Sequence, residues 1–323
     1  MIDTTTRRRL LAAAALASLA AAWSGTALAQ DWKPTKPITI IVPFPPGGGS
    51  DVLIRAVERG LSQRLGRPVV IENRTGASGA IGTEFAWRAA PDGYTLLVGS
   101  LDAHSMAPQL RKVPFDATKL VPVAGMASMG YVLMGRSDLP ANNLAELIAL
   151  GKTKELTYGS GGAGSSLHVF TELFARETDT KLLHVPFQGA GPGVLAVLGG
   201  QVDLMMVPIA VAPQHRGRLK AFGITPAQRV DSLKDVPTLS EQGVKVAGAS
   251  WIGVLAPPGL PANIGNTVGA AIREVVASAE FQPRLREIGM QPIQMTQPEF
   301  AKFYLDEYKK WGDVIRAAHI TVD

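Results

Sequence analysis

The sequence of 323 residues contains no cysteine, few aromatic residues and no large excess of either charge. The lack of cysteine excludes disulfide bonds, thiolate metal ligands, a cysteine nucleophile and a lipid-modified N-terminal cysteine. Aromatic residues make up 6% of the chain, which argues against a nucleic-acid surface of interleaved aromatic and basic side chains. With 46% hydrophobic and only 18% charged residues, the composition indicates a folded protein of about two domains.

Patterns typical of catalysis or metal binding are also missing. The sequence has no Gly-x-Ser-x-Gly, Ser-x-x-Lys or His-Glu-x-x-His motif. Ser166 and His168 could be imagined in a catalytic triad, but positions i and i+2 of a helix do not face each other. We therefore predict no catalytic residue, no cofactor and no metal site. The histidines are too dispersed to predict one: His104, His168, His184, His215 and His319.

Residues 1–29 have the order of an export signal. Arg7 to Arg9 precede an uncharged stretch, and the small residues Ala27 and Ala29 offer a cleavage site before Gln30. The uncharged run could also anchor the chain in a membrane, but most of it is weakly hydrophobic alanine. Both the general secretory and the twin-arginine routes remain open. We expect cleavage after Ala29, which lowers the net charge from +5 to +3, and a periplasmic protein.

Apolar runs and segments of helical length alternate along the mature chain. In the first part, strands are expected at Ile38–Val42, Val69–Ile71 and Tyr94–Val98, with helices over 51–65 and 79–90. In the first of these helices, an apolar residue recurs every fourth position and forms one stripe, which suits a helix packed on a sheet. The alternation is typical of a parallel sheet with crossover helices.

The pattern restarts after a proline- and methionine-rich stretch at 113–130. Helices are expected at about 142–152, 165–177 and 190–198, and a capping box, Thr296 with Glu299, begins the last helix. Because few strands precede residue 113, the chain should cross to a second lobe and return, which makes a hinged cleft. The two lobes are predicted at 30–130 plus 254–323 and at 131–253. Further strands are expected at 131–134, 156–158, 182–185, 202–207, 219–224 and 250–255.

Three of the strand-to-helix turns are rich in glycine: Pro43–Asp51, Gly159–Ser166 and Pro186–Gly193. Backbone amides and the positive end of a helix dipole make such a turn an anion site. Glycine can also serve structure alone by adopting positive φ, and serine can simply cap a helix. Three such turns at equivalent strand ends favour a ligand cleft, since ligands of open α/β sheets bind outside the carboxyl ends of the strands.

Residues 159–164 in the second turn satisfy Gly-x-Gly-x-x-Gly, which is typical of a dinucleotide site. The acid that would bind the ribose belongs at the end of the next strand, where this chain has Phe187 and Gln188. Asp179 precedes that strand and so lies at the wrong end of the sheet. The first turn also lacks the lysine of a phosphate loop.

The motifs in combination resemble the Bug family, the extracytoplasmic solute receptors, or substrate-binding proteins, of tripartite tricarboxylate transporters. The resemblance runs from about residue 36 to the C-terminus. It implies an α/β fold of the two-lobed periplasmic binding protein type (type II-like), with two chain crossings at a hinge, that closes on a small organic carboxylate. The segments that carry the resemblance are Ile38–Asp51, Ala89–Leu97, Leu156–Ser160, His184–Ala190, Gly199–Leu204, Asp235–Thr238 and Leu255–Pro257.

The resemblance implies that the first turn holds one carboxylate through backbone amides and water, while the other two turns hold the far end of the ligand. Asp203 could accept from an amino or hydroxyl group, or could merely orient the third turn. Val207–Ala210 replaces a pair that is often polar in the family, which admits an aromatic or hydrophobic carboxylate. The ligand-binding residues so predicted are Phe44, Gly48, Gly49, Ser50, Asp51, Ser100, Gly161, Gly162, Ser165, Ser166, Gln188, Gly189, Ala190 and Asp203.

The sequence therefore predicts a periplasmic solute-binding protein, not an enzyme, that delivers a carboxylate to the membrane subunits of a tripartite tricarboxylate transporter. We expect a monomer that binds no nucleic acid. The alternatives are a ligand sensor for a membrane signalling partner, built on the same fold, and an exported hydrolase, which would need a convergent catalytic set that the sequence does not display.

Overall fold

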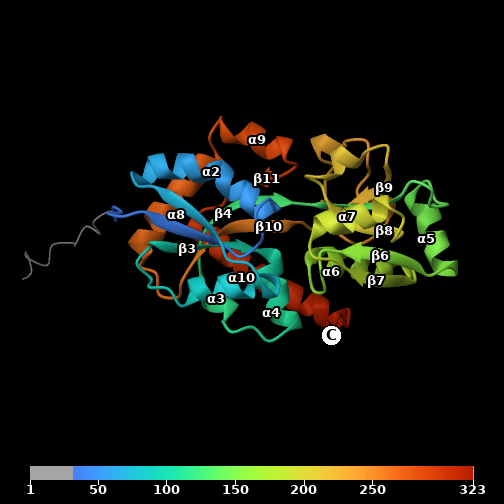
Figure 1. Cartoon of the computed structure of the whole chain (residues 1–323), viewed down its shortest axis with the longest axis horizontal. Coiled ribbons are helices and arrows are strands. Elements are labelled where there is room, and N and C mark those ends of the chain that lie inside the picture. The colour runs from blue at the N-terminus through green and yellow to red at the C-terminus, as the bar shows by residue number, and fades with distance from the viewer. Residues whose placement is uncertain (1–31, 323) are drawn as a thin grey trace, which may run out of the picture. The chain divides into compact units, whose positions relative to one another are not determined.

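The computed structural model describes residues 32–322, whose strands form two sheets (Figure 1). The six-stranded sheet has the order β11-β4-β10-β3-β1-β2, and the five-stranded sheet has the order β7-β6-β8-β5-β9. The first contains β1 (Ile38–Val42), β2 (Val69–Asn73), β3 (Thr95–Ser100), β4 (Val121–Met129), β10 (Ser250–Ala256) and β11 (Gln291–Pro292). The second contains β5 (Tyr131–Arg136), β6 (Leu156–Ser160), β7 (Leu182–Pro186), β8 (Leu204–Pro208) and β9 (Leu219–Ile224). The predicted export signal lies outside the described residues.

The helices follow the strands much as the sequence predicts. α2 buries the apolar stripe that begins at Leu53, and it ends at Gly66, whose φ of 67° is the left-handed conformation that glycine adopts readily. The helices associated with the first sheet are α2 (Gly49–Leu65), α3 (Ala80–Trp87), α4 (Ala107–Leu110), α8 (Ala262–Val276), α9 (Phe281–Glu287) and α10 (Gln297–Ala317). Those of the second are α5 (Leu144–Thr153), α6 (Ser166–Thr178) and α7 (Ala190–Leu198).

The three strands predicted to form a parallel sheet do so, and further strands make the six-stranded sheet mixed. β1 is parallel to β2 and β3, but β10 runs antiparallel to both β3 and β4. β4 itself was not predicted, because its residues are small and its burial depends on α10. A Cβ added to Gly125 would lie 2.5 Å from Ile293 and 3.0 Å from Phe300. The small residues of β4 thus make room for large ones elsewhere in the sequence.

The chain passes between the two sheets twice, at positions that lie side by side. The first crossing is Gly130, where an added Cβ would lie 2.3 Å from Pro226. The hydroxyl of Thr225 accepts from the amide of Tyr131 (3.0 Å) and donates to the carbonyl of Gly248 (2.7 Å), which ties the two crossings together. β10 pairs with β4 from Ser250 onward, so the lobe boundary predicted at residue 253 falls inside a strand.

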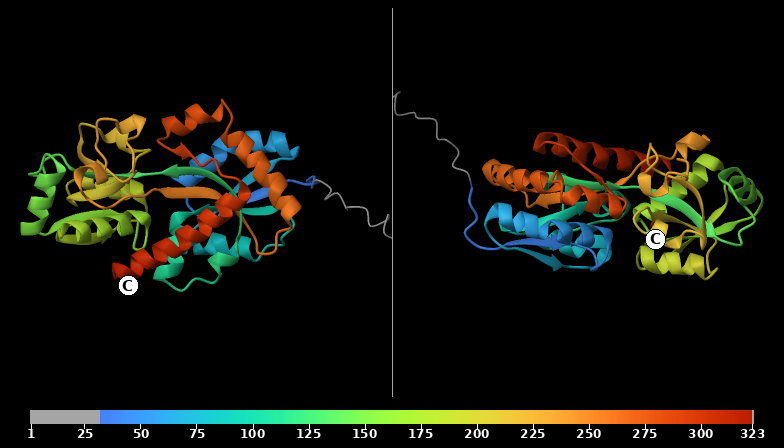
Figure 2. Two further views of the ribbon diagram at one scale, coloured as in Figure 1. Left: turned by 180° about the vertical axis from the view of Figure 1, so that it is seen from behind. Right: turned by 90° about the horizontal axis from the view of Figure 1, so that it is seen from above.

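α10 contacts both halves of the described chain. Its predicted capping box is present, with the amide of Thr296 donating to Glu299 at 2.8 Å. The N-terminal half packs on β4, while Trp311 near the other end meets Phe170 of α6 edge to face, with ring centroids 5.0 Å apart. Figure 2 shows α10, in red, running from the six-stranded sheet toward the five-stranded one.

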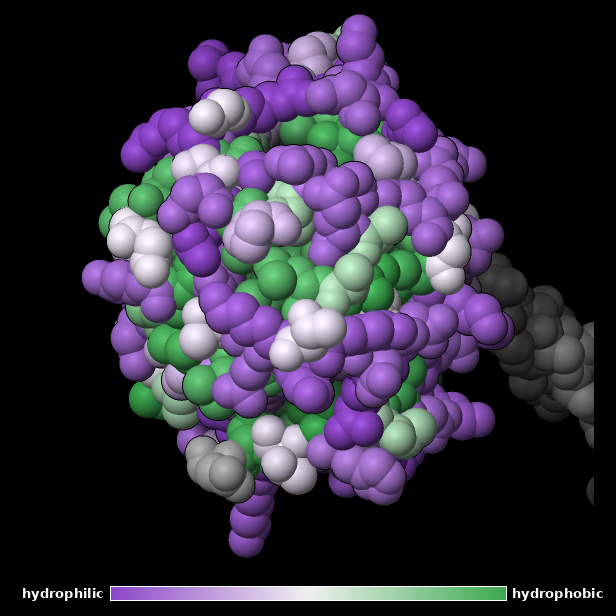
Figure 3. Space-filling model, turned by 90° about the vertical axis from the view of Figure 1, so that its right-hand side faces the viewer, coloured by the Kyte–Doolittle hydropathy of each residue, from purple (hydrophilic) through white to green (hydrophobic). Residues whose placement is uncertain are grey.

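Polar residues cover most of the face on the side of the five-stranded sheet, with apolar residues in separate areas between them (Figure 3). Isolated exposed apolar side chains are ordinary on protein surfaces. Among residues 32–322, no helix is both long and apolar enough to cross a lipid bilayer.

Candidate functional site

The first glycine-rich turn is held from inside by Asp51, whose side chain is buried. Its carboxylate accepts from the amide of Gly47 (2.9 Å), from the side-chain amide of Asn73 (2.8 Å) and from Nε of Arg55 (3.0 Å). Asn73 also donates to the carbonyl of Phe44 at 3.0 Å. Burial alone would raise the pKa of Asp51, but these hydrogen bonds hold it below its ordinary value. Asp51 therefore builds the turn, and its charge is compensated by Arg55.

The N-terminus of α2 remains open beside this network. The backbone amides of Gly49, Ser50 and Asp51 donate to no acceptor within residues 32–322. Gly47 supplies the left-handed residue of the turn, with a φ of 82°, whereas Gly48 is extended with a φ of −72°. Unbonded amides at the positive end of a 17-residue helix suit an anion.

The polar groups of the second turn form hydrogen bonds within the turn itself. Ser165 caps α6 by accepting from the amide of His168 (3.3 Å), and its hydroxyl donates to the carbonyl of Gly162 (2.7 Å). The hydroxyl of Ser160 accepts from the amide of Gly162 at 3.1 Å, and Nδ1 of His168 accepts from the amide of Gly164 at 3.0 Å. The serines and glycines predicted there are present at the turn, but as its internal supports.

A carboxylate from the other sheet already occupies the N-terminus of α6. Asp102 begins a short π-helical segment, Asp102–Met106, just after β3, and its Oδ1 accepts from the amide of Ser166 at 2.5 Å. The hydroxyl groups of Ser166 and Tyr131 are 2.6 Å apart. Burial raises the pKa of the Asp102 carboxyl above its ordinary value, although hydrogen bonds from Ser166 act against the rise. Within the described residues, Asp102 forms no ion pair.

The third turn lies against the second and leaves amides free. Gly189, with a φ of 108°, precedes α7, and the amides of Ala190 and Gly191 donate to no acceptor within residues 32–322. A Cβ added to Gly161 would lie 3.7 Å from the nitrogen of Ala190, which shows how closely the two turns approach. Gln188 is exposed. The structure thus places Gly161 beside Gly189 and Ala190.

Ser100 and Phe44 take part in the local structure of the first sheet. Ser100 is buried, its amide donates to Nδ1 of His104 (3.1 Å), and its hydroxyl accepts from the amide of Ala103 (3.4 Å). Burial lowers the pKa of His104 to about 4, so this histidine is neutral at neutral pH. The ring of Phe44 lies 3.5 Å from the position that a Cβ of Gly79 would take.

Asp203 lies apart from the glycine-rich turns, which corrects its predicted place near the pocket. It precedes β8 and binds the amide of Thr157 (2.9 Å) near the start of β6, whereas the second turn follows the end of β6. Nε of Arg136 donates to its other oxygen at 2.9 Å. Asp203 is therefore one partner of an ion pair at the amino ends of β6 and β8, opposite the ends from which the glycine-rich turns leave. In the stretch predicted to be apolar, Val207 and Ile209 are buried.

Sequence reasoning missed two charged residues that bridge the sheets, Asp102 and Arg111. Arg111 follows α4, and its guanidinium donates to the carbonyl of Ala163 in the second turn (2.7 Å) and to the hydroxyl of Ser78 (3.2 Å). Asp102 could have been noticed, since a polar residue two positions past a central strand stands at the ligand edge of a sheet. Arg111 gives no comparable signal.

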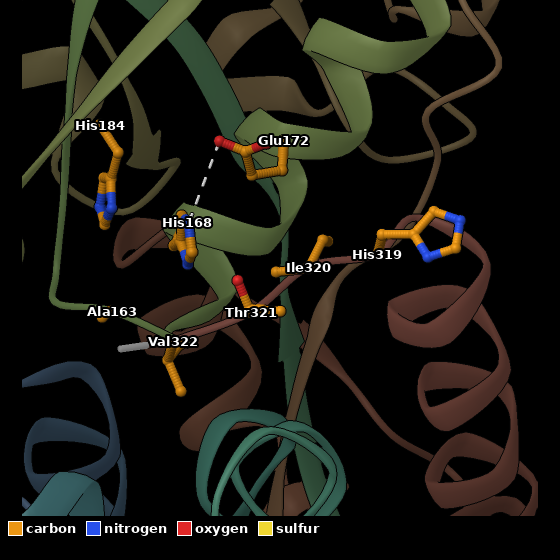
Figure 4. Close-up of a pocket in the computed structure, with 8 residues that line it drawn as sticks. All are labelled: Ala163, His168, Glu172, His184, His319, Ile320, Thr321 and Val322. Atoms are coloured by element: carbon orange, nitrogen blue, oxygen red, sulfur yellow. Dashed lines mark ion pairs between the residues drawn. The ribbon is translucent and has the colours of Figure 1, made fainter.

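A cavity of about 360 Å³ lies beside α6 and the C-terminal residues (Figure 4). The rings of His168 and His184 stack in its wall with centroids 4.0 Å apart, and Nε2 of His168 is 4.0 Å from Glu172. Burial lowers the pKa of each histidine to about 4, so the pair is neutral at neutral pH. Within residues 32–322, no three His, Cys, Asp or Glu side chains are grouped to hold a metal ion. Ala163, His319, Ile320, Thr321 and Val322 complete the lining.

Known proteins share this sequence pattern and fold. A family model described as "Tripartite tricarboxylate transporter family receptor" matches residues 53–320. Protein BugT of Bordetella pertussis is 34% identical over 309 residues, covering 92% of this chain and 94% of BugT. The Rhodopseudomonas palustris protein Rpa4515, solved with adipate, has a TM-score of 0.83 at 31% identity, covering 90% of this chain and 99% of that one. MatC of the same organism, solved with malate, has a TM-score of 0.77 at 31% identity, covering 87% and 99%.

Proposed function

The chain belongs to the tripartite tricarboxylate transporter receptor family, and on that basis we propose that it binds a small organic carboxylate and delivers it to the membrane subunits of such a transporter. The related proteins Rpa4515 and MatC were solved with adipate and malate, which are both carboxylates. Cleavage after Ala29 would place the mature protein, as a monomer, in the periplasm, where such a receptor works.

One observation carries the carboxylate proposal: the unbonded amides of Gly49, Ser50 and Asp51 at the start of α2. They lie at the carboxyl end of β1, where open α/β sheets bind ligands. Arg55 is already paired with Asp51, so a free cation is not offered by this residue. The positive end of the helix dipole would attract the carboxylate instead. The site offers directed N–H groups that match carboxylate oxygens.

The ligand would be enclosed by movement of the two lobes predicted at 30–130 plus 254–323 and at 131–253. Two short crossings, tied together by Thr225, support a hinge, and the movement would also have to accommodate the contact of Trp311 in α10 with Phe170 in α6. The contacts of Asp102 with Ser166 and of Arg111 with Ala163 are of the kind that would break on opening. The free amides of Ala190 and Gly191 would meet the ligand from the second lobe.

Calorimetric titration with carboxylates, after a thermal-shift screen, tests the proposal. We expect Ser50→Asp to weaken binding at least about tenfold, because a new negative charge would stand beside the bound carboxylate where solvent screening is poor. Ser137→Asp is the matched control, since Ser137 is exposed in the turn after β5. Equal affinities of the two variants, or no carboxylate that stabilises the protein, would contradict the proposal.

A further inference from the structure

We infer that Asp102 determines ligand specificity: it reserves the N-terminus of α6 and favours carboxylates with a hydrogen-bond donor at the far end over dicarboxylates. The inference rests on the proposed function, because it concerns the far end of a ligand whose first carboxylate binds at α2. It assigns to Asp102 the part that the sequence prediction gave to Asp203.

The position of Asp102 follows from sheet topology. β1 and β3 are adjacent and parallel, so the first glycine-rich turn and Asp102 leave the same edge of the six-stranded sheet. From there Asp102 reaches the other sheet and accepts from the amide of Ser166. One aspartate therefore touches the two elements between which a ligand would be held.

The occupied helix end removes one place where a second carboxylate could bind. The amide of Ser166 is taken by Asp102, and the amide of His168 is taken by the cap residue Ser165. A dicarboxylate would have to displace Asp102 or place its second charge near the same sign of charge. Both alternatives lower its affinity, because like charges repel strongly where water is partly excluded.

The lack of a cationic partner for Asp102 favours ligands that carry a hydrogen-bond donor at their far end. Asp51 is compensated by Arg55, whereas Asp102, which is partly buried, has no cationic partner among the described residues. A carboxylate without a counter-charge is costly in such a place, and a donor from the ligand would offset that cost. An ammonium or hydroxyl group at the far end of the ligand supplies the donor.

Two matched series of compounds test the inference by calorimetry: succinate, butyrate and 4-aminobutyrate, and adipate, hexanoate and 6-aminohexanoate. In at least one series, the wild type should bind the amino acid at least about tenfold more tightly than the dicarboxylate of equal length. Asp102→Asn keeps an oxygen for the amide of Ser166 but loses the charge, and it should reduce this ratio at least about tenfold. Asp306→Asn, an exposed aspartate of α10, is the control and should leave the ratio unchanged.

The ratio of amino acid affinity to dicarboxylate affinity separates specificity from a structural role, because loss of folding would weaken the binding of every compound alike. A wild type that binds the dicarboxylates as tightly as the amino acids overturns the inference without any variant, and so does an unchanged ratio in Asp102→Asn. In both cases carboxylates still bind, and the proposed function stands. If none of the six compounds binds the wild type, the inference fails, whereas the proposed function is decided by the wider thermal-shift screen of carboxylates.

Discussion

The N-termini of α2 and α6 arise from the same sequence pattern, a strand followed by a glycine-rich turn with serine, yet they end in different states. At α2, three amides stay unbonded, and the nearby Asp51 is neutralised by a cation four residues along the same helix. At α6, the first amide is bound by Asp102, which lies 64 residues away in sequence and on the other sheet. A helix end therefore offers free N–H donors only where the rest of the fold leaves them unsatisfied.

Removal of Asp51 should break this contrast most severely. Asp51→Ala deletes the acceptor of Gly47, Asn73 and Arg55, so we expect about 2–3 kcal/mol lower stability and loss of carboxylate binding. Urea denaturation and calorimetry would measure the two effects. Asp306→Ala on the surface of α10 should stay within about 0.5 kcal/mol of wild type. Normal carboxylate affinity in Asp51→Ala would show that the first turn does not need the hydrogen bonds of Asp51.

The glycines of the first turn sharpen the comparison at the level of the backbone. Gly47→Ala places a side chain at a φ of 82° with open space around it, so the cost is conformational and about 1–2 kcal/mol. Gly48→Ala is the neighbouring control and should be close to neutral in stability, because its φ is −72°. Chemical denaturation measures the stability of both variants. Equal losses of stability would contradict the view that Gly47 alone needs the left-handed conformation.

Ser165 tests whether the second turn is a support rather than a ligand contact. Ser165→Ala removes the cap of α6 and should cost about 1 kcal/mol. Because its hydroxyl is used inside the turn, affinity for carboxylates should remain within about twofold of wild type. Calorimetry against Ser50→Asp gives the comparison. A tenfold loss of affinity in Ser165→Ala would restore the role that the sequence predicted for this residue.

The smallest expected effect is a pH dependence of opposite sign at the two aspartates. The folded pKa of Asp51 is lowered, so its contribution to stability is present above the ordinary value of 3.8 and is lost as the pH falls through the folded pKa. The folded pKa of Asp102 is raised, so its charge costs stability at neutral pH, and the cost disappears as the pH falls toward 3.8.

Asp102→Asn should therefore be more stable than wild type at pH 7, by less than about 1 kcal/mol, and should lose that advantage by pH 4. Asp51→Asn should be less stable than wild type at pH 7, with a deficit that shrinks below pH 4. Urea denaturation at both pH values measures these differences. A deficit for Asp102→Asn that is largest at pH 7 would show that its charge stabilises the fold.

The sequence predicts local features of this molecule well. The stripe on α2, the end of α2 at residue 65 and the capping box of α10 depend on residues within one or two helical turns, and each is found. The first turn is similarly local, since Gly47 and Asp51 lie in one short segment. Such features are fixed by backbone conformation and side-chain periodicity, which a reader of the sequence can count.

Features that depend on distant partners were missed. Small residues of β4 leave room for Ile293 and Phe300. Nothing in the sequence of β4 itself indicates this packing. Asp102 and Asp203 are both aspartates beside strands, but the first reaches across to the other sheet while the second pairs with Arg136 at the far edge. The two aspartates differ in which end of the strand they occupy. Predicting that end from the sequence would have required strand bounds accurate to a residue or two.

The strand order also constrains how the molecule is made. β10 lies between β3 and β4, although about 120 residues of chain separate it from β4. The five-stranded sheet uses only residues 131–224, so all its strands exist once Ile224 has been synthesised. The six-stranded sheet lacks a central strand until Ser250–Ala256 arrives, and such distant pairing slows folding. The five-stranded sheet can therefore form during synthesis before β10 joins β3 to β4, and the six-stranded sheet also waits for β11 at Gln291–Pro292.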